Sequence, residues 1–161
     1  MAAHLRPADT RDRLTLKEIA VAERVAAGLG NKDVADELGI KAATVTGHMA
    51  SIGFKLCAGS RPSRIHAALS TGQVNAPAAG TAPSFSQDEL RLLQALATQP
   101  DDDAIAAAAG LVAKRVSLHV RALLLKAGAR NATHLVGLSH AWELLGPSAS
   151  AQSAANTATT W

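Results

Sequence analysis

Apolar side chains recur along residues 14–71 at the spacing that places them on one face of a helix. The pattern predicts four helices, over residues 16–27, 31–38, 42–56 and 61–70. Thr15 and Glu18 have the spacing of a capping box at the start of the first helix. Asn31 is expected to cap the second helix, and Gly39 stands where a left-handed residue commonly ends a helix.

The second and third of these helices are separated by a tight turn that contains glycine. A short helix, such a turn and a second helix make the helix-turn-helix plan. In that plan the second helix, here residues 42–56, enters the major groove of DNA.

The residues that carry this pattern stand in a specific order: Leu14-Thr15-Leu16-Lys17-Glu18, Gly28-Leu29-Gly30-Asn31-Lys32-Asp33-Val34-Ala35, Thr44-Val45-Thr46-Gly47-His48, Lys55-Leu56 and Ser60-Arg61. In order and spacing they are similar to the DNA-binding domain of the LuxR/FixJ/GerE family of bacterial transcription regulators. The resemblance implies double-stranded DNA as partner, a recognition helix in the major groove, and pairing of domains through the fourth helix.

The second half of the chain repeats the first at a shift of 71 residues without a gap, so that Glu18 falls on Glu89, Gly39 on Gly110 and His48 on His119. The repeat predicts helices near 87–98, 102–109, 113–127 and 131–145. We therefore expect an all-α fold of two tandem four-helix domains, the second one diverged. The expected divisions are a flexible arm (1–13), domain 1 (14–71), a flexible linker rich in Gly and Pro (72–83), domain 2 (84–146) and a disordered tail (147–161).

The candidate DNA-binding residues lie on the two expected recognition helices and at the basic positions around them. In the first half they are Lys32, Lys41, Ala43, Thr44, Thr46, Gly47, His48, Ser51, Lys55 and Arg61. In the second half they are Lys114, Arg115, Ser117, His119, Arg121 and Lys126.

Both halves depart from the family pattern on the surface expected to meet DNA. Thr46 and Ser117 replace the usual lysine, and Gly47 removes a side chain from the first recognition helix. Asp101, Asp102 and Asp103 begin the second helix of the second half, where they either repel phosphates or simply cap that helix.

The charge is unevenly divided, although the whole chain has a formal net charge of only +3. Residues 1–71 hold ten Lys and Arg against seven Asp and Glu, whereas the remainder holds six of each. The single cysteine, the lack of an apolar leader and the lack of a long apolar run favour a cytoplasmic protein without a membrane span. His and Cys are not spaced as metal ligands, and no catalytic motif or cofactor-binding loop is visible, so we expect no enzyme, metal or cofactor.

Two questions stay open at this level. The halves could pair within one chain, or the last helix could pair with another chain through Leu135, Leu138 and Trp142, for which core packing is the alternative explanation. The main expectation is sequence-specific DNA binding to an imperfect inverted repeat. The rival is a protein-interaction module that acts on another regulator or on RNA polymerase.

Overall fold

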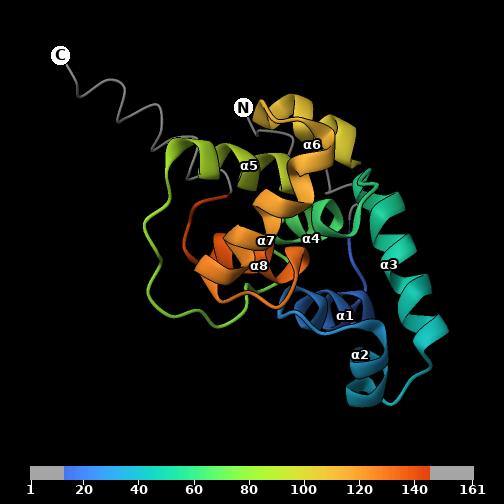
Figure 1. The fold of residues 1–161 in the computed structure, drawn as a ribbon. Helices are drawn as coiled ribbons and strands as arrows, with labels where there is room; N and C mark the ends of the chain where they lie inside the picture. Colours follow the sequence, from blue (N-terminus) through green and yellow to red (C-terminus); the bar gives the residue numbers. More distant parts are fainter. Residues whose placement is uncertain (1–12, 146–161) are drawn as a thin grey trace, which may run out of the picture.

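The computed structural model describes residues 13–145, which contain helices and turns but no β-strand (Figure 1). The all-α class predicted from the sequence is confirmed for this range. The helices are α1 (Leu16–Ala26), α2 (Asn31–Leu38), α3 (Ala42–Leu56), α4 (Arg61–Ser70), α5 (Gln87–Thr98), α6 (Asp102–Ala109), a 3₁₀ turn η1 (Ala113–Arg115), α7 (Val116–Ala127) and α8 (Ala132–Ala141). The predicted arm, except Arg13, and the predicted tail lie outside the described residues.

Local sequence signals explain most of the helix ends. Thr15 with Glu18, and Ser86 with Glu89, form the two expected capping boxes at the starts of α1 and α5. Gly39 ends α2 with a left-handed backbone (φ 65°), which a residue without Cβ adopts at little cost.

Three local expectations were wrong. The N-cap of α2 is Gly30, because the Asn31 side chain turns toward α3 and α4 instead of toward its own helix. The last helix runs over Ala132–Ala141 and not to residue 145, since the backbone leaves the helix at Trp142 and becomes left-handed at Glu143. The helix expected near residues 113–127 begins as a 3₁₀ turn over Ala113–Arg115 and is an α-helix only from Val116 onward.

Each half has its own apolar core. The first is built around the fully buried Val21, Val34, Val45, Ile52 and Ile65. The second includes Leu93, Val116, Leu123 and Leu135. Leu135 and Leu138 are buried within the chain, and Trp142 donates from its indole Nε1 to the carbonyl oxygen of Gly80 (2.8 Å).

The two halves pack against one another through α4 and α8, near the centre of Figure 1. In addition, α4 packs against α5 and α8 packs against α1. His66 of α4 and His140 of α8 meet at this contact, with His66 Nδ1 2.8 Å from His140 Nε2.

Residues 72–83 also join the two halves. Val74 is buried in the first core, Pro77 lies beside Gly137 of α8, and Gly80 accepts the hydrogen bond from Trp142. The segment predicted as a flexible linker therefore touches the folded chain at Val74, Pro77 and Gly80, whereas its alanines are exposed.

Candidate nucleic-acid interface

Helix α3 lies at the right-hand edge of Figure 1. One of its faces packs against the rest of the first half, and the opposite face is exposed. Its inner residues Val45, Met49 and Ile52 are almost fully buried, and α2, α1 and α4 pack against it. The helix therefore has a fixed orientation and an open outer surface, as a groove-binding helix requires.

The outermost residues of α3 carry almost no polar groups. Ala43, Gly47, Ala50 and Phe54 follow one another at helical spacing and all are exposed, with Phe54 88% exposed. Thr44 and Thr46 are exposed beside this strip, and His48 and Ser51 are half-buried at its margins.

Thr46 belongs to a hydrogen-bond network that joins α2, α3 and α4. Asn31 donates from Nδ2 to Thr46 Oγ1 (3.0 Å), and Thr46 donates in turn to the Ala42 carbonyl oxygen (3.2 Å). Arg61 donates to Asn31 Oδ1 (2.7 Å) and to the Leu29 carbonyl oxygen (3.3 Å). Arg61 is half-buried, and burial together with the charge of Arg64 lowers its pKa. The guanidinium thus orients Asn31, which fixes the start of α2 beside α3.

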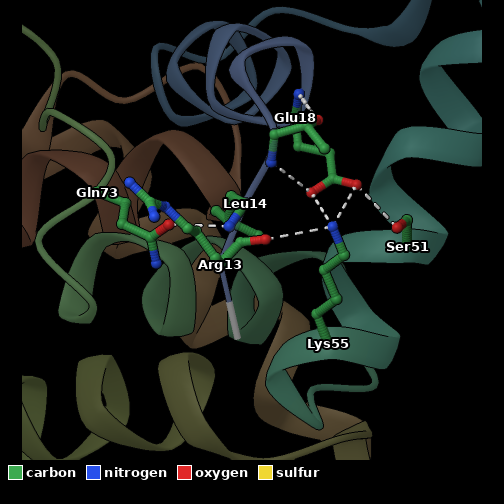
Figure 2. A network of polar contacts seen from close by, with 7 residues as sticks. Arg13, Leu14, Glu18, Ser51, Lys55 and Gln73 are labelled. Atoms are coloured by element: carbon green, nitrogen blue, oxygen red, sulfur yellow. Dashed lines mark hydrogen bonds and ion pairs between the residues drawn. The ribbon is translucent and has the colours of Figure 1, made fainter. Parts of the chain in front are cut away.

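A second network holds the other end of α3 to the start of α1 (Figure 2). The buried Glu18 carboxylate accepts hydrogen bonds from Lys55 Nζ (2.8 and 3.0 Å), from the Ser51 hydroxyl (2.9 Å) and from the Thr15 amide (3.1 Å). Lys55 also donates to the Arg13 carbonyl oxygen (3.3 Å). Burial alone would raise the pKa of Glu18, but the hydrogen bonds from Lys55, Thr15 and Ser51 together hold it below its usual value.

Two lysines near α3 remain exposed. Lys32 lies in the first turn of α2, and Lys41 is the N-cap residue of α3. Within residues 13–145 neither one forms an ion pair. Their ammonium groups are therefore available for ionic contacts, of which contacts with phosphates are one kind.

The corresponding surface of α7 is both more basic and more apolar. Its exposed candidates are Lys114, Arg115, Ser117, His119 and Arg121. Between them lie Leu118, 61% exposed, and Leu125, 80% exposed. Lys126 pairs with Glu89 (2.8 Å) and lies over the Phe85 ring, 5.4 Å from its centroid, so its charge is engaged within the chain.

The start of α6 carries three aspartates, whereas the first turn of α2 holds Lys32 and Asp33. Asp101 accepts a hydrogen bond from the Ala104 amide (2.9 Å) and therefore caps α6. Asp102 and Asp103 are exposed in the first turn. The network around Asn31 has no counterpart here, because the positions 71 residues after Asn31 and Arg61 hold Asp102 and Ala132.

Residues 12–68 match the family model described as bacterial regulatory proteins, luxR family. No curated protein and no solved structure matches the chain. Residues 12–68 are therefore similar to a LuxR-type helix-turn-helix domain, and we call them the LuxR-type domain. The similarity supports DNA binding by this part of the chain. The match ends before α5, so the interpretation of the second half as a diverged copy stays a prediction.

The LuxR-type domain leaves some of its predicted DNA-binding residues exposed, leaves His48 half-buried and uses others in internal hydrogen bonds. Lys55 and Ser51 form hydrogen bonds with Glu18, and Arg61 forms one with Asn31. Lys32, Lys41, Ala43, Thr44, Thr46 and Gly47 remain exposed. Direct roles of all these residues in DNA binding remain predictions.

Sequence reasoning missed the exposed apolar residues Phe54, Leu118 and Leu125. The signal was present, because Phe54 and Leu125 are 71 residues apart and both lie opposite the apolar face that marks their helices. An apolar residue that does not share the helical spacing of the buried residues is expected to have an exposed side chain.

Two kinds of feature are absent from the described part of the chain. In residues 13–145, no three His, Cys, Asp or Glu side chains come together as a possible metal site. None of the helices in that range combines the length and apolar character needed to cross a bilayer.

Proposed function

We propose that the chain is a sequence-specific transcriptional regulator whose two halves pair within one chain to read an imperfect inverted repeat. The LuxR-type domain supplies α3 as one reading helix, and α7 is the corresponding helix of the second half. The observation that carries this proposal is the reciprocal set of contacts between the halves.

These contacts have the pattern of a two-fold symmetric interface. A contact from the second half to the first half is repeated, at the corresponding residues, by a contact from the first half to the second. Asn131, the N-cap of α8, donates to the carbonyl oxygen of Gly28 after α1 (3.0 Å). The hydroxyl of Ser60, the N-cap of α4, lies 3.4 Å from the carbonyl oxygen of Gln99 after α5. Ser60 and Asn131 are 71 residues apart, as are Gly28 and Gln99.

The packing of whole helices follows the same relation. Helix α4 meets α8 directly, α1 meets α8, and α4 meets α5. The resemblance assigned pairing of family domains to the fourth helix, and here the fourth helix of each half meets the other half of its own chain. This supports pairing within one chain over pairing of α8 with a second chain.

A second function is favoured for α7 by its surface. Leu118 and Leu125 are exposed at a spacing of seven residues, which places them on one side of the helix. Leucine side chains cannot form hydrogen bonds with base edges, but they can pack against an apolar surface of a protein. In addition, the negative charges of Asp102 and Asp103 on α6 repel phosphates. The second candidate is therefore a regulator that binds DNA through α3 and a protein partner through α7.

Selection from a random duplex library at low salt, with the full-length protein, separates these functions. Two enriched half-sites at fixed spacing, with one protein chain per duplex by mass measurement, are expected for intrachain pairing. One enriched half-site favours the second candidate, and no enrichment contradicts DNA reading.

The phosphate contacts can be tested on the same duplexes. Lys32→Ala and Lys41→Ala are each expected to weaken binding, and each lowers the slope of log affinity against log salt by about 0.9, because one phosphate is no longer neutralised. Lys17→Ala, an exposed lysine of α1, is the matched control for the removal of one charge. Unchanged slopes in both the Lys32 and the Lys41 variants would contradict docking of α3 in the groove.

A further inference from the structure

Three of the five polar side chains of α3 are engaged within the chain. The five are Thr44, Thr46, His48, Ser51 and Lys55. Ser51 and Lys55 donate to Glu18, whereas Thr46 donates to Ala42 and accepts from Asn31. Thr44 and His48 have no side-chain hydrogen bond to the rest of residues 13–145.

The side chains that make strong base-specific hydrogen bonds are missing from this helix. Bidentate recognition of guanine needs Arg or Lys, and that of adenine needs Asn or Gln. Residues 42–56 contain no Arg, Asn or Gln, and their one lysine, Lys55, is paired with the buried Glu18 carboxylate. Asn31, the nearest amide at the start of α2, is occupied on both its oxygen and its nitrogen.

The outer face of α3 presents mainly methyl groups to solvent. Ala43 and Ala50 are exposed through their Cβ methyls, and Thr46 keeps its hydroxyl turned to Asn31 and the backbone. Gly47 lies between these residues with nothing within 4 Å of the place where a Cβ would be. The missing side chain lets the backbone of α3 come close to the floor of a groove.

The major groove offers one apolar feature that distinguishes base pairs, which is the C5 methyl group of thymine. Resting on the proposed function, we infer that α3 selects its half-site by contacts of Ala43, Thr44, Thr46 and Ala50 with thymine methyl groups. Lys32 and Lys41 then fix the helix on the phosphates, and hydrogen bonds to base edges contribute little to the selection.

Deoxyuridine provides the test on the DNA side, because it lacks only the methyl group of thymine and pairs identically with adenine. The selection is run in parallel with a thymine library and with a library in which deoxyuridine replaces thymine. We expect thymines at defined positions of the α3 half-site and loss of that enrichment in the deoxyuridine library. In single-site replacements on the enriched duplex, each contacted methyl removed should weaken binding about fourfold, the effect of one buried methylene-sized group.

Thr46→Ser provides the matching test on the protein side, because it removes one methyl group and keeps the hydroxyl that bonds to Ala42 and Asn31. The variant should bind the thymine duplex about fourfold more weakly, and one deoxyuridine replacement should then cost it nothing further. Thr98→Ser, at the exposed end of α5, is the matched control, and deoxyuridine outside the α3 half-site is the control on the DNA.

The outcomes separate this inference from the function on which it rests. Enrichment in neither library contradicts DNA reading itself. Equal enrichment of one motif in both libraries leaves DNA reading intact and overturns the methyl-contact inference. If Thr46→Ser still loses as much affinity as the wild type for deoxyuridine at every position, the contact assigned to Thr46 is refuted. Ala43→Gly and Ala50→Gly then test the other methyl groups in the same way.

Discussion

Replacing Glu18 by glutamine tests whether the buried ion pair under α3 holds the LuxR-type domain together. The side chain of Glu18 is 5% exposed and that of Lys55 is 22% exposed. Removing one partner of a buried pair costs about 3–5 kcal/mol, because the other charge is left uncompensated. Glutamine keeps one oxygen for Lys55 or Ser51, and the Lys55 ammonium retains some water, so we expect a loss of about 2–3 kcal/mol.

The second half supplies a matched control at the same place in its own fold. Glu89 pairs with Lys126 at the same distance, 2.8 Å, but the two side chains are 29% and 37% exposed. An exposed pair contributes about 0–1 kcal/mol. Glu89→Gln should therefore cost less than about 1 kcal/mol, although the sequence pattern of the two pairs is the same.

Urea unfolding at neutral pH measures both losses as the shift in midpoint multiplied by the slope. The low pKa of Glu18 adds a further criterion. A carboxyl group with a lowered folded pKa stabilises the folded state above its unfolded pKa and loses that effect as the pH falls through the folded value. The difference in free energy of unfolding between the wild type and Glu18→Gln should therefore shrink below about pH 4. Equal losses for Glu18→Gln and Glu89→Gln, or a difference that does not change with pH, would refute the reasoning.

Three further outcomes follow from other contacts. An added Cβ at Gly137 would overlap the Ala26 carbonyl oxygen, so Gly137→Ala should cost about 1–3 kcal/mol in urea unfolding and loosen α8 from α1. Burial, and then the charge of His66, lower the pKa of His140 to about 4. Stability should thus fall as the pH drops from about 6.5 to about 4, and His140→Gln should flatten this part of the profile. Asp102→Asn combined with Asp103→Asn should raise affinity for duplex DNA at low salt if α6 lies beside phosphates, and no gain would place that helix away from DNA.

The sequence was sufficient for features set by near neighbours in the chain. The capping boxes at Thr15 and Ser86, the left-handed Gly39 and the helix phases all depend on residues within about one turn. The bounds of α2, α3 and α4 agree with the prediction for that reason.

Features set by distant partners could not be predicted in this way. Asn31 has a good capping side chain, but Arg61, 30 residues later, draws it away from its own helix. The end of α8 and the packing of residues 72–83 depend on the other half of the chain, since Trp142 bonds to Gly80 and Pro77 lies against Gly137. The engagement of Lys55 by Glu18 required knowing that Glu18 is buried.

Several positions that agree between the halves have partners inside the chain. Examples are the Glu18–Lys55 and Glu89–Lys126 pairs and the caps Ser60 and Asn131. The Asn31–Arg61 hydrogen bond is an exception, because Asp102 and Ala132 stand at the corresponding positions.

Differences gather where the outer faces of α3 and α7 have no such partner. Ala43, Gly47 and Ala50 correspond at a spacing of 71 residues to Lys114, Leu118 and Arg121. These outer residues are not needed to maintain the fold, so their chemistry is free to suit whatever each helix meets. If both helices read DNA as proposed, surfaces this different are expected to favour different base sequences, and the inverted repeat that they share is then imperfect.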